Sequence, residues 1–277
     1  MTISDYQKDC FKNYKREIGY PTEYTYLLGT PINVLVPIET KLNKVMIVGA
    51  YPSAKFFTIN GIADTPMADN DSPFSNESYF DGSRVRTIPS GKELNEVILD
   101  RIGINRCDCW ITDLIKVFLF KDGHINRYEK LGKNDIKENR SKFIEFAKLS
   151  MNRLENEIEI CNPYVIILLG MEVTKVVFDL ADNKAKEFLD GKNRFKNIRD
   201  VERNIICLPH PGILMKKTDR NPWPDRFENE ISLKAKSEIE KIRKPNENNH
   251  KWRQYVPKTE NFSTSIGYRL KYQTILL

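Results

Sequence analysis

The chain has 277 residues, of which 40% are hydrophobic and 30% charged, with 44 Lys and Arg against 38 Asp and Glu. This composition, with a formal net charge of +6, differs from that of disordered and fibrous chains. It predicts an ordinary globular protein. The mild positive charge permits an anionic partner such as DNA but does not require one.

The N-terminal 40 residues predict a helix followed by a tyrosine-rich packing arm. They contain no apolar stretch of the kind found in signal peptides, and no run in the chain reaches about 18 apolar residues. We therefore expect a cytoplasmic protein with no membrane span.

Four short, continuously apolar runs dominate the middle of the chain, and each is typical of a parallel strand buried on both faces. They are residues 45–49 (VMIVG), 109–115 (CWITDLI), 164–170 (YVIILLG) and 204–208 (NIICL). Helices are expected between and after them, at residues 90–103, 141–160, 171–181 and 224–243.

Strands that alternate with helices predict an α/β fold, here a three-layer α/β/α sandwich with a central four-stranded parallel sheet. The expected organisation has three parts. These are the N-terminal helix and packing arm (1–40), an α/β domain (41–245) and a C-terminal extension packed on it (246–277).

Ligands of an open parallel sheet bind at the carboxyl ends of its strands, so the residues just after each run are candidates for chemistry. The first run leads into GAYPS at residues 49–53, and the second carries Asp113 and leads to Lys116. The fourth leads into PHPGIL at residues 209–214. Polar or rigid residues are thus expected to meet at one edge of the sheet.

These strings together resemble the uracil-DNA glycosylase superfamily, over roughly residues 40–230. GAYPS stands where that family has its first motif, and residues 90–118 resemble the helix and strand that follow it. NPYVIILLG resembles the third strand, and LPHPGILMKK resembles the second motif, a His-Pro pair followed by a DNA-inserting loop. The resemblance implies a monofunctional enzyme that flips a base out of DNA and hydrolyses its N-glycosidic bond.

The resemblance also implies a role for each matching residue. His210 is expected to stabilise the leaving base, and Asp113 to read its edge. The base pocket is completed by Gly49, Ala50, Tyr51 and Pro52. The residues expected to contact DNA are Ser53, Lys55, Lys116, Gly212, Leu214, Lys216 and Lys217, with Leu214 as the wedge that fills the vacated space.

Purely structural readings of these residues remain open. Leu214 is also compatible with the start of a core helix, and His210 with a turn. Asp113 is also compatible with a turn cap or an ion pair with Lys116.

Two departures from the family pattern change the expected chemistry. Where active relatives carry a carboxylate or Asn after the Gly of the first motif, this chain has Ala50 and Tyr51. Since Tyr is a poor base at neutral pH, either the acid group comes from elsewhere, such as the acidic loop 62–81, or the usual chemistry is not used. Asp113 replaces the Asn that reads uracil, and a carboxyl group suits a base with an amino group, such as cytosine, a 5-substituted cytosine or adenine.

The five cysteines form no CxxC pair; they are Cys10, Cys107, Cys109, Cys161 and Cys207. Relatives with an iron–sulfur cluster have four cysteine ligands, one of them directly after the Lys that follows the second strand, where this chain has Val117. We therefore expect reduced thiols, no metal and no cofactor.

Two functions remain open from the sequence. The first is a monomeric DNA glycosylase that excises a modified or non-uracil base, in repair or in defence against modified DNA. The second is an inactive member that binds DNA, a nucleotide or a free base. The aromatic residue that stacks on the base is not fixed; the candidates are Phe56, Phe57, Tyr79 and Phe80, with Arg86 near where some relatives carry Phe.

Overall fold

The computed structural model describes residues 1–26, 29–52, 56–59, 62–66, 72–75, 78–80, 84–87 and 89–244, and the structural statements below concern these residues. The chain divides into two units, Met1–Lys244 and Pro245–Leu277. The second unit lies outside the described residues, and so does the predicted packing of the C-terminal extension.

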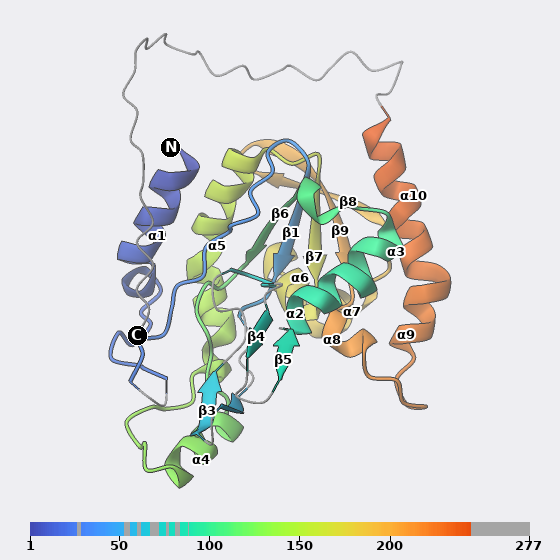
Figure 1. Cartoon of the computed structure of the whole chain (residues 1–277). Coiled ribbons are helices and arrows are strands. Elements are labelled where there is room, and N and C mark those ends of the chain that lie inside the picture. Colours follow the sequence, from blue (N-terminus) through green and yellow to red (C-terminus); the bar gives the residue numbers. More distant parts are fainter. Residues whose placement is uncertain are drawn as a thin grey trace. The chain divides into compact units, whose positions relative to one another are not determined.

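A five-stranded sheet forms the centre of the first unit, in the order β6-β1-β7-β9-β8 (Figure 1). Its strands are β1 (Val45–Gly49), β6 (Cys109–Asp113), β7 (Val165–Leu169), β8 (Asn193–Ile198) and β9 (Val201–Leu208). The strands β6, β1, β7 and β9 run parallel. Every residue of β1, β6 and β7 is buried, as continuous apolar runs require, so the four predicted strands are confirmed.

The prediction of a purely parallel, four-stranded sheet is wrong at one edge, where β8 adds an antiparallel strand beside β9. The two strands are joined by a two-residue turn, Arg199 and Asp200, with φ angles of 48° and 63°. Two successive positive φ angles are typical of a type I′ hairpin, which usually contains Asn and Gly. Arg199 is held by ion pairs to Glu155 and Glu159 of the helix α5 (Phe143–Cys161), which fix the turn.

Helices cover both faces of the sheet, so the fold is the three-layer sandwich that the sequence predicts (Figure 1). One layer contains α1 (Ile3–Glu17), α5 and α6 (Met171–Phe178). The other contains two helical runs, each with a π-helical centre. The first is α2 (Pro89–Glu93), Leu94–Leu99 and α3 (Asp100–Ile102); the second is α9 (Trp223–Arg226), Phe227–Ile231 and α10 (Ser232–Arg243).

Shorter elements lie in the connections. They are the hairpins β2 (Phe56–Ile59) with β3 (Ile62–Pro66) and β4 (Ser78–Phe80) with β5 (Val85–Thr87), and the helices α4 (Asp122–Lys130), α7 (Asp182–Glu187) and α8 (Pro211–Leu214).

The predicted helices are present, and the N-terminal helix belongs to the main core. The helix predicted over residues 90–103 ends at Gly103, whose φ of 71° places it in the left-handed conformation favoured at helix ends. Tyr6, Cys10 and Tyr14 of α1 are fully buried in the same core as the sheet. No helix in the described part of the chain is both long and apolar enough to cross a membrane.

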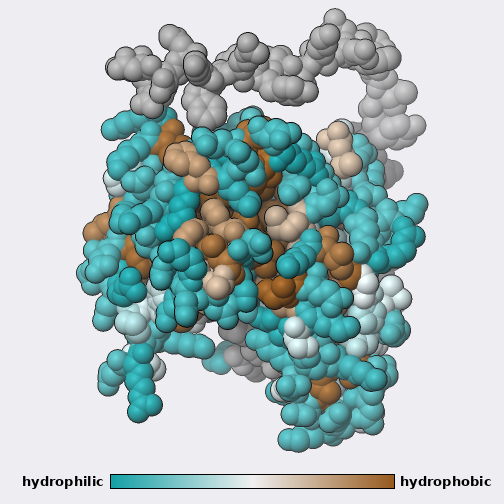
Figure 2. Space-filling model, turned by 180° about the vertical axis from the view of Figure 1, so that it is seen from behind, coloured by the Kyte–Doolittle hydropathy of each residue, from teal (hydrophilic) through white to brown (hydrophobic). Residues whose placement is uncertain are grey.

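Some large apolar side chains remain at the surface, among them Phe195 and Val201 on the β8–β9 hairpin. On the face seen in Figure 2, apolar side chains gather near the middle within a rim of polar ones. Apolar atoms contribute roughly half of the accessible surface of a folded protein, so exposed apolar side chains by themselves do not identify a partner.

The left-handed turn allows a test of the β8–β9 hairpin. Since Asp200 has a φ of 63°, Asp200→Val should lower the free energy of unfolding by roughly 1–2 kcal/mol, whereas Asp200→Gly should not lower it. Urea denaturation of both variants measures the difference. Equal stabilities of the Val and Gly variants would show that the turn does not have this conformation.

Candidate active site

Gly49 and Asp113 end two neighbouring parallel strands at the same register. The Asp113 side chain is almost fully buried and lies over Gly49, because a Cβ added to Gly49 would be 2.1 Å from Asp113 Oδ1. The two backbone segments stay paired beyond the strands, since the Leu114 N–H donates to the Gly49 carbonyl at 2.9 Å. A glycine at position 49 is therefore needed for the carboxyl group to lie at this edge.

Phe74 lies against the same glycine. A Cβ on Gly49 would be 2.6 Å from Cε2 of the Phe74 ring, and the ring is also 6.4 Å from the His210 ring, centroid to centroid. Phe74 is buried and has a φ of 53°, which is rare for a bulky residue and is often found at functional sites. Its carbonyl accepts a hydrogen bond from Arg106, which also pairs with Glu39.

His210 follows β9 and caps the short helix α8. Its Nδ1 accepts a hydrogen bond from the Gly212 N–H at 3.0 Å. Gly170, at the end of β7, lies against it, since a Cβ there would be 3.2 Å from His210 Cβ. Gly170 has a φ of 100°, so both space and backbone conformation favour glycine.

The surroundings of His210 keep its ring neutral. Desolvation by nearby protein atoms, followed by repulsion from Lys121, lowers its pKa from 6.5 to about 4. The residue is nevertheless exposed to solvent. Because Nδ1 accepts a hydrogen bond, the neutral ring carries its proton on Nε2 and presents an N–H donor there.

Tyr51 connects the end of β1 to a charged pair. Its hydroxyl accepts a hydrogen bond from Arg140 Nε at 2.8 Å, and Arg140 forms an ion pair with Glu172 in the first turn of α6. The Arg140 guanidinium also lies 4.9 Å from the Tyr51 ring centre and 4.7 Å from that of Phe143. The first motif has no carboxylate of its own, but Tyr51 is linked through Arg140 to the carboxylate of Glu172 on α6.

The loop after His210 carries exposed positive charge. Lys216 and Lys217 are exposed, and Asn221 holds this loop by donating to the carbonyls of Ile213 and Lys216. Lys121, whose charge acts on His210, is a further exposed cation near the site that the sequence prediction missed.

The structure contradicts the prediction that Leu214 is an exposed wedge. Leu214 is 4% exposed and belongs to the core, whereas Met215 is 53% exposed. In the one-turn helix α8, Pro211 and Leu214 are three residues apart and both buried, which leaves Ile213 and Met215 on the outside.

The prediction that Lys116 contacts DNA is also wrong. Its side chain is fully buried, and its ammonium group is 2.6 Å from Glu157 of α5. A lysine in this position cannot reach a phosphate on the surface.

The structure describes only some of the remaining predicted site residues. Ala50 and Pro52 are buried beside Gly49, and the Gly212 N–H donates to His210. The predicted DNA contacts Ser53 and Lys55 lie outside the described residues. The same holds for the acidic side chains of the loop 62–81, for the aromatic candidates Phe56, Phe57, Tyr79 and Phe80, and for the side chain of Arg86.

The cysteines do not form a cluster site in the described part of the chain. Cys10, Cys109, Cys161 and Cys207 are buried, Cys107 is exposed, and none forms a disulfide. No group of three or more His, Cys, Asp or Glu residues there has the arrangement of a metal site.

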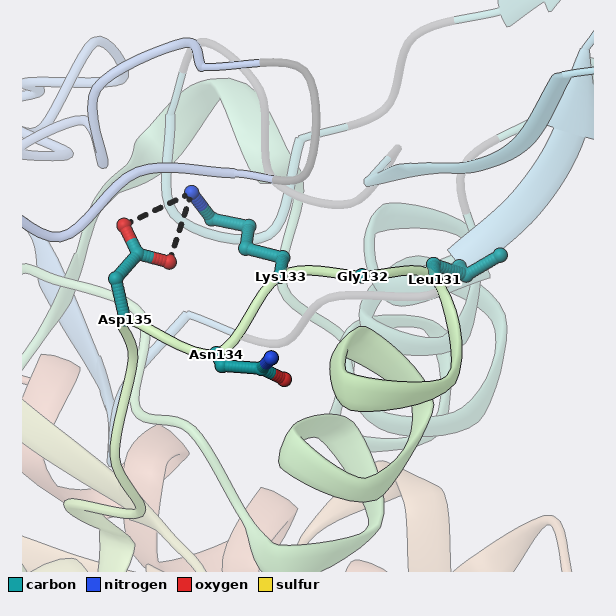
Figure 3. A pocket seen from close by; sticks show the side chains of 5 residues that line it. All are labelled: Leu131, Gly132, Lys133, Asn134 and Asp135. Atoms are coloured by element: carbon teal, nitrogen blue, oxygen red, sulfur yellow. Dashed lines mark hydrogen bonds and ion pairs between the residues drawn. The ribbon is translucent and has the colours of Figure 1, made fainter.

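A hollow elsewhere on the surface follows α4 and is lined by five consecutive residues, Leu131, Gly132, Lys133, Asn134 and Asp135 (Figure 3). Lys133 and Asp135 pair with each other across it at 3.2 Å. The hollow is formed by one turn and contains none of the residues around Gly49.

One protein-family model matches most of the chain. The model described as the uracil DNA glycosylase superfamily matches residues 38–231, well over half of the chain. The match includes Gly49, Phe74, Asp113 and His210. No curated protein matches the chain.

The contact at Gly49 predicts the effect of a single methyl group. Gly49→Ala should displace both Asp113 and Phe74, because the added Cβ would overlap them, and should lower the free energy of unfolding by about 1–3 kcal/mol. Gly123→Ala is the matched control, since a Cβ on this α4 residue meets no atom within 4 Å. Denaturation of both variants measures this; equal stabilities would contradict the close packing at Gly49.

The neutral state of His210 predicts a pH dependence. Between pH 6.5 and about 4 the unfolded chain binds a proton that the folded His210 does not, so this residue makes stability fall as the pH is lowered. NMR titration of the His210 ring, assigned with His210→Gln, should give a midpoint near 4. A midpoint above 6 would show that the ring is not held neutral.

Proposed function

Since the chain belongs to the uracil DNA glycosylase superfamily, we propose that it is a DNA glycosylase that flips a modified or non-uracil base out of the duplex and hydrolyses its N-glycosidic bond. The observation that carries the proposal is the position of Phe74, which lies against Gly49 as Asp113 does and is 6.4 Å, ring centre to ring centre, from His210. These side chains supply a flat ring, a group that reads a base edge and a hydrogen-bond donor.

Phe74 is the proposed stacking residue for the flipped base. A base that leaves the duplex loses its stacking partners, and an aromatic ring in the enzyme replaces them. The ring of Phe74 lies next to both Gly49 and His210, so a base against it would also be near Asp113. The strained backbone of Phe74 supports a functional role for this placement.

Asp113 is proposed to select a base that carries an amino group. An ionised carboxylate accepts hydrogen bonds, and a protonated carboxyl accepts one and donates one. In either state Asp113 can accept from an exocyclic amine such as that of cytosine, whereas an ionised carboxylate would repel the O4 carbonyl of uracil. The almost complete burial of Asp113 makes such a mismatch costly.

His210 is proposed to stabilise the leaving base. When the bond between C1′ and the base nitrogen breaks, its electron pair stays on the base, and negative charge develops on a carbonyl oxygen such as O2. A neutral imidazole with its proton on Nε2 can donate a hydrogen bond to that oxygen without prior rearrangement. The lowered pKa of His210 favours this neutral form at physiological pH.

Water completes the reaction by adding to C1′ and losing a proton, and an acid group near the sugar would assist. Tyr51 occupies the position where relatives carry this group, and its hydroxyl is already hydrogen-bonded to Arg140. Glu172, paired with the same Arg140, is therefore the carboxylate to substitute first in a search for the missing group.

DNA is proposed to lie across the loop that follows His210. Lys216, Lys217 and Lys121 offer exposed charge for phosphates, and Gly212 allows close approach of the backbone. Met215 replaces Leu214 as the proposed wedge, because it is the exposed apolar side chain of this loop that lies nearest to the lysines in sequence.

One observation favours a second candidate function. The first motif has Ala50 and Tyr51 in place of a carboxylate, and Tyr51 is engaged with Arg140. A member without the acid group would still bind a base or DNA at the same edge. Retained binding of duplexes, with no abasic site formed from any base, would identify the protein as this inactive member.

Two substitutions test the glycosylase directly, with alkali-sensitive abasic sites as the readout on duplexes that contain uracil, hypoxanthine or modified cytosines. His210→Ala should lower the single-turnover excision rate by roughly 10²–10³-fold, the usual effect of removing one such donor. Asp113→Asn should shift the preference from amino-bearing bases toward uracil. Unchanged rates in His210→Ala, or an unchanged preference in Asp113→Asn, would refute the assigned roles.

A further inference from the structure

Lys116 has a fully buried ammonium group whose hydrogen bonds are complete. Its Nζ donates to Thr112 Oγ1 at 2.8 Å and to the Asp113 carbonyl at 3.0 Å, and lies 2.6 Å from Glu157 Oε1. An ammonium group has three N–H donors, so each has an acceptor. Two of these acceptors belong to the last two residues of β6, directly before and at the proposed base-reading position.

Glu157 holds Lys116 from the helix layer. Its Oε1 also accepts from the Tyr6 hydroxyl of α1 at 2.5 Å, and its Oε2 accepts from Trp110 Nε1 of β6 at 3.1 Å. Burial and the negative charge of Glu157 raise the pKa of Tyr6, so Tyr6 remains a donor. The carboxylate thus joins α1, α5 and β6 through one buried network.

The N-terminal helix contributes a second hydroxyl to this network. The Tyr14 hydroxyl accepts a hydrogen bond from the backbone N–H of Lys116 at 2.9 Å. It shares another with the Ser150 hydroxyl of α5 at 2.6 Å. The side chain and the backbone of Lys116 are therefore both fixed by the helix layer that contains α1 and α5. This network lies immediately behind the strand end that carries Asp113.

A buried ion pair is seldom the most stabilising solution, because apolar side chains of similar volume often stabilise a core as well or better. Apolar side chains could not, however, bond to the Asp113 carbonyl. That bond has a clear use, because the Asp113 carboxyl group must lie over Gly49 where no additional atom fits. A small rotation of the Asp113 backbone would move its carboxyl group away from a bound base.

We propose that Lys116, held by Glu157, is a positioning residue that fixes Asp113 for base recognition. Tyr6 and Tyr14 of α1 belong to the same hydrogen-bond network. This role rests on the proposed function for its use, but the positioning itself is a property of the protein without DNA. Lys116 acts through the Asp113 backbone and touches neither substrate nor reacting atoms.

The test uses the double variant Lys116→Met/Glu157→Gln in the full-length protein. Lys116→Met alone would leave the Glu157 charge buried without its partner and is expected to destabilise the fold, so both charges are removed together. Arg153→Leu is the matched control. The Arg153 side chain also joins α1 to α5, through Asp9 and Glu17, but it has no described contact with Lys116, Glu157 or the end of β6. Circular dichroism first establishes that all variants fold.

The first readout needs no substrate. In protein labelled with ¹³C at the Asp carboxyl carbons, the Asp113 signal is identified by its loss in Asp113→Asn. The double variant should shift or broaden this signal, while the Arg153→Leu control leaves it unchanged. An Asp113 signal that is the same in the double variant as in the unsubstituted protein would overturn the proposal, whether or not the protein is a glycosylase.

The second readout is a double-mutant cycle on excision. The double variant should slow single-turnover excision by roughly 10²-fold, the effect of a small misplacement at an active site. In the Asp113→Ala background the same change should cost less than about threefold, because no carboxyl group is left to position. Equal losses in both backgrounds would overturn the proposal. If the unsubstituted protein excises no base, the proposed function fails, and the carboxyl signal alone decides the positioning role.

Discussion

The absence of a side chain at Gly49 is the constraint on which the site depends. Asp113 and Phe74 both occupy space that a Cβ at this position would fill, and Phe74 in turn lies next to His210. Three segments distant in the sequence therefore converge at one backbone position. A second glycine, Gly170, allows the same close approach for His210. The parallel register of the sheet brings these two glycines to the same edge as the polar side chains.

The site combines a neutral histidine with a buried carboxyl group. Desolvation lowers the pKa of His210, so the ring is a hydrogen-bond donor through Nε2 rather than a cation. Asp113, the last residue of β6, is almost fully buried. A neutral hydrogen-bond donor and a buried carboxyl group suit the proposed reaction, in which the base leaves as an anion and is recognised through an amino group. Where the first motif lacks a carboxylate, Tyr51 is hydrogen-bonded to Arg140, which forms an ion pair with Glu172.

The sequence predicted the parts of the fold and site that depend on local pattern. Continuous apolar runs predicted β1, β6, β7 and β9, and the parallel order of these strands places Asp113 and His210 at the same edge of the sheet. The β8–β9 hairpin was missed because its turn uses Arg199 and Asp200, which take positive φ angles without the usual glycine. Its turn is held by ion pairs from Arg199 to Glu155 and Glu159 of α5, which lie 44 and 40 residues earlier in the sequence.

Tertiary packing explains the errors at the site. Lys116 has the sequence position of a surface cation but is buried with Glu157, which no local pattern reveals. Leu214 is turned inward by the one-turn helix that begins at Pro211. Phe74 was missed because it follows no strand of the central sheet, and the catalytic and base-pocket residues were predicted from the strand ends.

The most direct measurement of the central claim is a crystal structure with a duplex that carries a 2′-fluoro cytosine analogue, which resists cleavage of the glycosidic bond. The account predicts a flipped base stacked on Phe74, with its amino group within hydrogen-bond distance of Asp113 and its O2 facing His210 Nε2. A base that remains in the duplex, or one bound away from Gly49, would contradict it.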